Sequence, residues 1–343
     1  MRWTRGHVLG HGSSATVSTA MSTTGDVFAV KSVVVSQSET LQREQQFLSM
    51  LNSPFVVAYK GCDITKEKKN FMYNLLMQYM PGGTVIDAIN RRDCTRLNEL
   101  EISNYTRQIL QGLVYIHSYG IVHCDIKGAN LLVDEDSVRI ADFGCAKWVS
   151  ERVPVRGTPM FMAPEVARGD EQGFAADVWA LGCVVIEMAT GCSPWLNVHD
   201  PVSVLYKIAY SGESPEIPSV LSNQARDFIS KCLVHDPKQR WGAMELLKHP
   251  FITQFDCGGN IGQDLWTESP TGILDQYAWS SIGELQSAGT DSIEPMCSSF
   301  SLRQRIEQLE GNSDMANWRW EMEEEINWMT IRSNGSGGVV ADD

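Results

Sequence analysis

The sequence lacks the features of a membrane protein, a disulfide-rich secreted protein or a zinc site. Its most apolar stretch after the start, residues 178–189, is too short to span a bilayer and contains Glu187. Residues 1–12 have no apolar core of the kind that a signal peptide needs. The nine cysteines include no pair separated by two residues and no histidine at zinc-ligand spacing. We therefore expect reduced thiols in a cytoplasmic or nuclear protein that has no membrane partner.

Basic residues are scarce at the end of the chain. Residues 256–343 hold 16 acidic residues against four arginines and no lysine, so they carry −12 of the formal net charge of −14. This charge disfavours a nucleic acid as partner. The segment is rich in serine and glycine, as linkers are, yet it contains five tryptophans and a periodic stretch at 302–331. We expect a regulatory tail, disordered in part, that docks on another protein or back on the preceding residues; a merely solubilising role is an equal alternative.

The first part of the chain changes character near residue 80. Residues 8–35 predict strands joined by a glycine turn and a second turn at 24–26, the last strand leading into Lys31. Residues 39–51 predict a helix, with Glu44 on the same stripe as Leu41 and Leu48, where an unpaired carboxylate would be costly. Longer helices are predicted at 100–118 and 177–190. A small sheet-rich lobe followed by a larger helical lobe is expected, which is an α+β fold.

A glycine-rich stretch, residues 10–17, lies between two of the predicted strands. A dinucleotide-binding fold would instead have a helix after the glycines, so that fold is disfavoured. The pattern is weak alone and gains weight from two residues further along the chain. Lys31 ends an apolar strand, and Glu44 is the carboxylate placed to pair with it. Together these residues could provide the phosphate cradle and the cation that phosphoryl transfer requires.

A second polar cluster lies in the larger lobe. Residues 123–130 lie between two apolar runs, which would hold the loop from both sides. Asp125 is placed to accept the proton of an attacking hydroxyl, and Lys127 could reach the phosphate that is transferred. Asn130 and, twelve residues later, Asp142 offer oxygen ligands of the kind that Mg²⁺ prefers.

The ordered set of motifs resembles the protein kinases, from the glycine stretch through Asp142-Phe143-Gly144 to Ala163-Pro164-Glu165. Residues 177–182 and 235–240 also resemble the large kinase lobe, in which the counterparts of Glu165 and Arg240 pair. The resemblance covers residues 3 to about 255. It implies a bilobal kinase domain at 1–255, with a β-rich N-lobe at 1–77 that has one regulatory helix. A hinge at 78–83 and a mainly helical C-lobe at 84–255 would come next, and the tail would occupy 256–343.

The resemblance also implies ATP and Mg²⁺ as cofactors. Lys31, Glu44, Asp125 and Lys127 would be catalytic, and Asn130 and Asp142 would bind the metal. The residues expected to contact ATP are Leu9, Gly10, His11, Gly12, Ser13, Ser14, Ala15, Val17, Ala29, Lys31, Met77, Gln78, Tyr79, Met80, Asn130, Leu132 and Asp142. Among these, Met77 is the expected gatekeeper, and residues 78–80 would meet the adenine through backbone groups.

Finer features resemble the MEKK-like MAP kinase kinase kinases, in particular a short plant clade linked with stress and abscisic-acid signalling. The resemblance rests on residues 3–6, 123–128 and 157–166, and Lys127 and Thr158 are typical of serine/threonine specificity. It implies a MAP kinase kinase as the protein substrate, with upstream or tail-binding proteins as further partners. The particular substrate, the activator and the oligomeric state stay open.

Two positions depart from the family pattern. Ala15 stands where many kinases have the third glycine, and an extra methyl group there should be tolerated. Cys124 stands where many kinases have an arginine that holds a phosphorylated loop. We therefore expect substantial basal activity, with weaker switching by loop phosphorylation or a use of Lys147, Arg152 or Arg156 in its place. Alternatively, Cys124 simply packs as a small apolar side chain.

Two other functions compete with catalysis. The chain could be a pseudokinase scaffold that binds partners through the kinase fold, although Lys31, Asp125, Asn130 and Asp142 are all intact. The tail could instead be the principal interaction module, with the kinase domain as its regulator.

Overall fold

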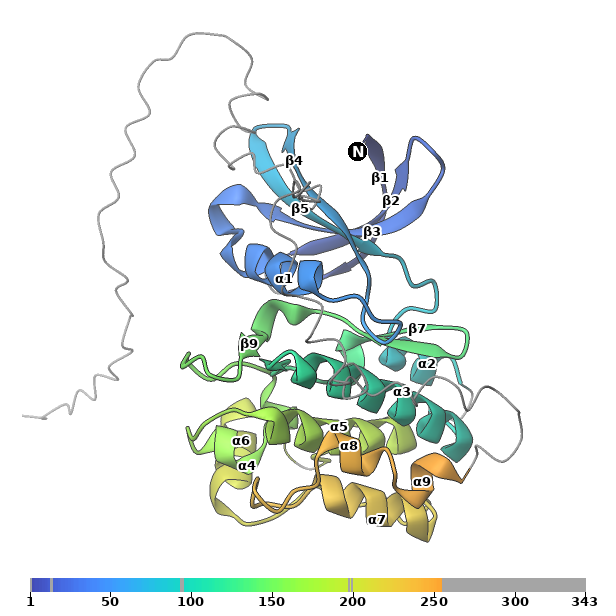
Figure 1. The fold of residues 1–343 in the computed structure, drawn as a ribbon, viewed down its shortest axis with the longest axis vertical. Helices are drawn as coiled ribbons and strands as arrows, with labels where there is room; N and C mark the ends of the chain where they lie inside the picture. The colour runs from blue at the N-terminus through green and yellow to red at the C-terminus, as the bar shows by residue number, and fades with distance from the viewer. Residues whose placement is uncertain (1, 13–14, 93–95, 197, 199, 255–343) are drawn as a thin grey trace, which may run out of the picture.

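The computed structural model describes residues 2–12, 15–92, 96–196, 198 and 200–254, so the predicted acidic tail lies outside the described residues. Figure 1 shows a smaller lobe, formed by the first part of the chain, stacked on a larger helical lobe. The expected α+β, bilobal architecture is therefore confirmed. None of the described helices combines the length and the apolarity that crossing a bilayer requires.

The smaller lobe is built on an antiparallel sheet with the strand order β1-β2-β3-β5-β4. Its strands are β1 (Trp3–His11), β2 (Thr16–Ser22), β3 (Val27–Val34), β4 (Tyr59–Glu67) and β5 (Asn70–Gln78). Valine and aromatic residues favour the pleated conformation in β3 and β5. Strand β1 begins earlier than the predicted start at Val8, because residues 3–6 form a partly exposed strand without regular apolar alternation.

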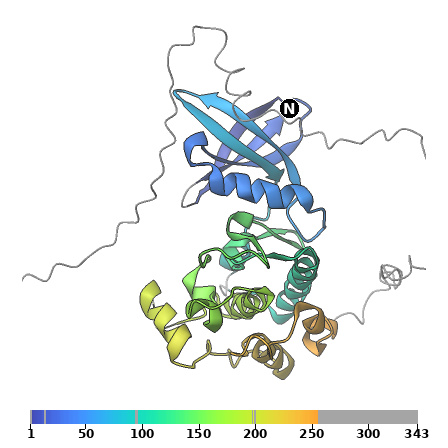
Figure 2. The ribbon, with the colours of Figure 1, turned by 60° about the vertical axis from the view of Figure 1, so that its left-hand side comes forward.

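Helix α1 (Glu39–Met50) lies between the sheet and the helical lobe, as Figures 1 and 2 show. It agrees closely with the helix predicted at 39–51. The short 3-10 helix η1 (Val35–Gln37) precedes it. Leu41, Glu44, Phe47 and Leu48 are buried, so the carboxylate of Glu44 faces the interior together with the apolar stripe.

The larger lobe surrounds one central helix. Helix α5 (Phe174–Thr190) is buried on nearly all sides, as its almost uniformly apolar sequence predicts, and it begins before the expected Asp177. Helix α3 (Glu99–Ser118) packs beside it and begins with a capping box, in which Asn98 and Glu101 satisfy each other's amides. The remaining helices are α2 (Val85–Asn90), α4 (Pro164–Ala167), α6 (Pro201–Tyr210), α7 (Asn223–Cys232), α8 (Ala243–Leu246) and α9 (Pro250–Thr253).

Short strands form the part of the larger lobe that faces the sheet. Strand β6 (Ile121–Val122) pairs with β9 (Lys147–Trp148), and β7 (Leu131–Asp134) pairs with β8 (Ser137–Ile140). The 3-10 turns η2 (Gly128–Asn130), η3 (Phe143–Cys145) and η4 (Pro159–Phe161) lie in the loops between these elements. A continuous apolar core includes buried side chains from both lobes, among them Leu48, Phe143 and Trp179. The lobes are therefore packed together at the place where the loops carry the predicted site residues.

Candidate active site

Four strands align the glycine stretch with Lys31. Gly10 on β1 lies opposite Val17 on β2, which lies opposite Lys31 on β3, and Lys31 lies opposite Leu75 on β5. The amide of Gly12 donates to the carbonyl of Ala15 at 2.8 Å and closes the turn between β1 and β2. Ala15 is half-buried and packs against the core. Ser13 and Ser14, which were expected to contact ATP, lie outside the described residues.

The side chains expected around the adenine come from several strands. Ala29 on β3 lies opposite Met77 on β5, and both are buried. Leu132 is half-buried on β7, whose neighbour Val133 donates its amide to the carbonyl of Gly83 at 2.8 Å. This bond fastens the predicted hinge to the larger lobe.

Other residues expected to contact ATP differ in exposure. Met80 is buried, Tyr79 is half-buried, and Leu9 and His11 are exposed on β1. Gln78 ends β5 and accepts a hydrogen bond from Arg139 at 2.8 Å. Leu9 is thus the apolar member of the predicted set that solvent reaches most easily.

Lys31 joins the two lobes through its ammonium group. Its Nζ lies 2.7 Å from Oε2 of Glu44 on α1 and 3.0 Å from Oδ1 of Asp142 in the larger lobe. Asp142 adopts a left-handed conformation, with φ of 62°, and accepts the amide of Gly144 at 3.3 Å. The predicted pairing of Lys31 and Glu44 is present, and the same ammonium group also contacts a second carboxylate, that of Asp142.

Burial and the neighbouring charges shift the pKa values of Lys31, Glu44 and Asp142 in opposite directions. Burial alone would lower the pKa of Lys31, but the carboxylates of Glu44 and Asp142 outweigh it and hold that pKa above its usual value. Burial raises the pKa of Glu44 to about 7, against the attraction of Lys31. Burial would also raise the pKa of Asp142, but Lys31 prevails and keeps it below the usual value. Lys31 therefore remains a cation and Asp142 an anion at neutral pH.

The loop at 123–130 is anchored by a buried carboxylate on α5. Asp177 accepts the amides of His123 and Cys124, each at 2.9 Å, and it contacts Nε2 of His117 at 2.9 Å. The ring of His123 lies edge-on against Phe143 and contacts the carbonyl of Ala141 at 3.0 Å. These contacts fix the loop against the interior, so the side chains after His123 have defined positions.

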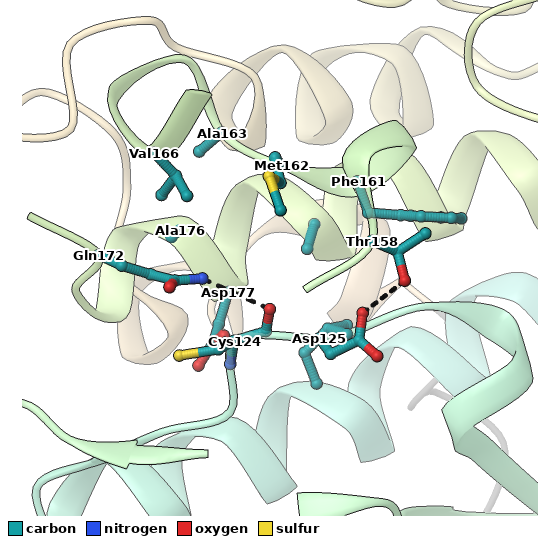
Figure 3. A pocket seen from close by; sticks show the side chains of 12 residues that line it. Cys124, Asp125, Thr158, Phe161, Met162, Ala163, Val166, Gln172, Ala176 and Asp177 are labelled. Atoms are coloured by element: carbon teal, nitrogen blue, oxygen red, sulfur yellow. Dashed lines mark hydrogen bonds between the residues drawn. The ribbon is translucent and has the colours of Figure 1, made fainter. Parts of the chain in front are cut away.

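Asp125 lies at the centre of a hydrogen-bonded group, part of which Figure 3 shows. The hydroxyl of Thr158 donates to its Oδ1 at 2.7 Å, and the amide of Asn130 donates to its Oδ2 at 3.0 Å. Nζ of Lys127 lies 2.9 Å from Asp125 Oδ2 and 2.7 Å from the Thr158 hydroxyl. A cavity of only about 10 Å³ beside this group is lined by Asp125, Thr158 and Phe161, among others. The carboxylate is thus oriented by donors on three sides.

Asn130 and Asp142 have the chemistry that a Mg²⁺ site requires. Nδ2 of Asn130 donates to Asp125, and among the described residues no hydrogen bond to the amide oxygen of Asn130 is present, so this oxygen can bind a metal ion. The side chain of Asp142 is 45% exposed. In the described part of the chain, no three His, Cys, Asp or Glu side chains form a complete metal cage. Mg²⁺ is usually held by one or two protein oxygens together with phosphate and water. The two residues fit an ion of that kind.

Comparison with known proteins agrees with this geometry. Residues 3–252 match the protein kinase domain family. The chain belongs to the protein kinase family. It is 51% identical to mitogen-activated protein kinase kinase kinase 18 of Arabidopsis thaliana, over 83% of this chain and 86% of that protein.

Other similar proteins are also named mitogen-activated protein kinase kinase kinases. Mitogen-activated protein kinase kinase kinase 17 of Arabidopsis thaliana is 50% identical over 83% of this chain and 78% of its own length. Mitogen-activated protein kinase kinase kinase A of Dictyostelium discoideum is 37% identical over 80% of this chain and 30% of its own length. The chain is thus a serine/threonine kinase of the MAP kinase kinase kinase type, and the predicted resemblance is confirmed. Nothing in these comparisons supports the scaffold alternative.

Cys124 occupies an unusual place in this kinase. It is buried in a left-handed conformation with φ of 68°, and burial raises the pKa of its thiol well above the usual value. Of the cations expected to replace the missing arginine, Lys147 is buried and donates to the carbonyl of Glu151 at 3.0 Å. Arg152 is exposed and Arg156 is half-buried. Cys124 is therefore a packed, protonated side chain in this structure.

Three contacts around the site were not predicted. The hydroxyl of Thr158 binds both Asp125 and Lys127, although the sequence indicated only its specificity class. Asp177 anchors the loop, although it appeared only within a family motif. Glu187 accepts the amide of Gly128 at 3.1 Å, and burial raises the pKa of its carboxyl to about 7. A sequence signal existed for Glu187, since it is the carboxylate inside the apolar run at 178–189.

Proposed function

We propose that this kinase transfers phosphate from ATP to serine or threonine of a MAP kinase kinase. The observation that carries the proposal is that Lys31 of the small lobe pairs with Asp142, next to the loop that carries Asp125. The two segments are joined by the amide of Ala141, which donates to the carbonyl of Asn130 at 2.9 Å. The names of the similar proteins support the place of the chain in a MAP kinase cascade. Stress and abscisic-acid signalling remain predictions from the resemblance, and a location in the cytoplasm or nucleus remains a prediction from the cysteine pattern.

Each residue has a defined task in the proposed reaction. Lys31, held by Glu44, neutralises phosphate oxygens of ATP. Asp125 orients the substrate hydroxyl and accepts its proton, because Thr158 and Asn130 fix both carboxylate oxygens. Lys127 stabilises negative charge near the same hydroxyl.

Asn130 and Asp142 would hold Mg²⁺, which supplies charge neutralisation on the phosphates when bound. The turn between β1 and β2 would cover the phosphates with backbone amides, since Gly10 has open space where a side chain would begin. The adenine would lie between Val17, Ala29 and Leu132, near the gatekeeper Met77.

We also propose the domain division into a kinase domain at 1–255 and a regulatory tail at 256–343. The family match ends at residue 252, which supports a boundary near that position. Truncation after residue 255 tests the division. A shortened protein that phosphorylates its substrate at least as well as the full chain supports a modulating tail, whereas lost activity with retained folding assigns the tail a direct part in catalysis.

A panel of catalytically inactive MAP kinase kinases tests the proposed function. Purified protein is incubated with Mg-ATP and each panel member, and phosphate on the substrate is located by mass spectrometry. We expect phosphorylation of at least one member on serine or threonine, and a loss of signal by orders of magnitude with the Lys31→Met variant. Turnover by Lys31→Met equal to that of the unaltered protein would remove Lys31 from the proposed mechanism, and no transfer to any member would remove the proposed substrate class.

A further inference from the structure

Helix α1 is tied to the larger lobe by a contact outside the catalytic set. Arg43, the neighbour of Glu44, places its NH2 group 2.5 Å from Oε2 of Glu151 and donates from Nε to the carbonyl of Ala146 at 3.1 Å. The two side chains are about one quarter exposed, at 25% and 28%. The contact therefore joins a helix of the small lobe to the segment after Asp142.

Aromatic packing lies beside this ion pair. The guanidinium of Arg43 lies 5.5 Å from the ring centre of Phe47, one turn further along α1. Phe47 in turn packs against Trp148, with ring centres 5.5 Å apart. We call Arg43, Phe47, Trp148 and Glu151 the α1 latch. Its two contacts lie on the same side of α1 and act on the same segment.

Glu151 is held in place by its own backbone surroundings. Its carboxylate accepts the amide of Trp148 at 3.2 Å, and its own amide donates to the carbonyl of Trp148 at 2.9 Å. The ammonium of buried Lys147 binds its carbonyl at 3.0 Å. The hydrogen bond from Arg43 also lowers the pKa of the Glu151 carboxyl, so it is an anion at neutral pH. Glu151 is thus a fixed negative charge that faces α1.

Arg43 of the latch directly precedes Glu44 on α1, so the latch holds the part of the helix that carries this carboxylate. A buried carboxylate needs its counter-charge, and the buried carboxylate of Glu44 lies 2.7 Å from Nζ of Lys31. Many signalling proteins order such segments with a phosphate that arginine side chains bind. The residue before Asp125 is Cys124, which is buried and offers no cation for a phosphate.

We propose that Glu151 is a positioning residue that holds α1 through Arg43, so that the pairing of Lys31 with Glu44 forms without a phosphate on the loop. This inference rests on the proposed kinase function. It gives the expected basal activity a physical origin, because the necessary negative charge is a permanent part of the sequence.

The test uses Glu151→Gln, which keeps the shape of the side chain and removes its charge. Glu67→Gln is the matched control, since Glu67 forms an ion pair with Arg5 at 2.6 Å within the small lobe, away from the site. The full-length proteins are treated with phosphatase, checked by mass spectrometry, and assayed with ATP and an inactive MAP kinase kinase. Thermal unfolding is measured in parallel.

We expect Glu151→Gln to lower kcat about tenfold, equivalent to ~1.4 kcal/mol, and Glu67→Gln to leave it unchanged. The two variants should unfold at similar temperatures. The latch acts through Glu44, so Glu151→Gln should cause no further loss in a Glu44→Gln background. A merely structural role would give additive losses.

An unchanged kcat for phosphate-free Glu151→Gln overturns the inference, and so do fully additive losses in the double variant. The inference is also overturned if Glu151→Gln and Glu67→Gln both lower kcat and the loss in each follows the fall in its unfolding temperature to the same degree. Failure of the underlying kinase function is distinguishable, because the unaltered protein would then transfer no phosphate at all.

Discussion

Arg240→Met removes a guanidinium group that lies against five acceptors. Its nitrogens contact both carboxylate oxygens of Glu165, at 2.7 and 2.9 Å, and the carbonyls of Ala175, Val234 and His235. Both charged side chains are almost fully buried, at 0% and 5% exposure. Without the arginine, Glu165 becomes a buried anion with no cation. Breaking a buried pair in this way costs about 3–5 kcal/mol of unfolding free energy.

Urea unfolding followed by circular dichroism measures this loss. Arg168→Met serves as the control, because Arg168 and Asp170 form an exposed pair at 3.4 Å whose removal should cost under about 1 kcal/mol. The double variant Glu165→Leu with Arg240→Met should recover much of the stability, since no isolated charge remains. An Arg240→Met variant that loses less than about 1 kcal/mol would refute the reasoning from burial.

Two further predictions concern groups that contact the site. Thr158→Val removes the hydroxyl that contacts both Asp125 and Lys127, and it should lower kcat roughly 10- to 100-fold. Thr158→Ser keeps the hydroxyl and should have a kcat close to that of the unaltered protein. Equal kcat values for all three proteins would contradict the role of the hydroxyl. Burial raises the pKa of Glu187 to about 7 from 4.5, so the folded state holds its proton more tightly and stability should fall as pH rises between those values. The unfolding free energy of Glu187→Gln, relative to the unaltered protein, should therefore be higher near about pH 8 than near about pH 4. Denaturant titrations at the two pH values measure it. The same relative unfolding free energy at both pH values would argue against the raised pKa of Glu187.

Local patterns predicted the elements that have clear periodicity. The apolar stripe of α1 gave its bounds and the inward direction of Glu44, and the need to pair a buried carboxylate gave its contact with Lys31. The start of α5 was placed too late, because Gly173 at its N-terminus has no capping side chain. The start of β1 was also placed too late, since residues 3–6 have no regular apolar alternation.

Some contacts within the site could be predicted from the sequence, and others could not. The short spacing between Asp125 and Asn130 fixed those two residues on one loop, where they meet at 3.0 Å. The contacts of Thr158 with Asp125 and of Glu151 with Arg43 depend on how the chain folds back after β9. That path is set by long-range packing, and no local spacing in the sequence encodes it.

The central claim is that Asp142 and Asn130 hold Mg²⁺ for the same ATP molecule that Lys31 contacts. Calorimetric titration of ATP, with and without Mg²⁺, into the unaltered protein and the Asp142→Asn variant tests it most directly. Asp136→Asn, on an exposed turn, is the control. The account predicts that Mg²⁺ tightens ATP binding in the unaltered protein and the control, and that this gain is lost in Asp142→Asn. If Mg²⁺ tightens ATP binding to the Asp142→Asn variant as much as to the unaltered protein, the claim that Asp142 holds Mg²⁺ is contradicted.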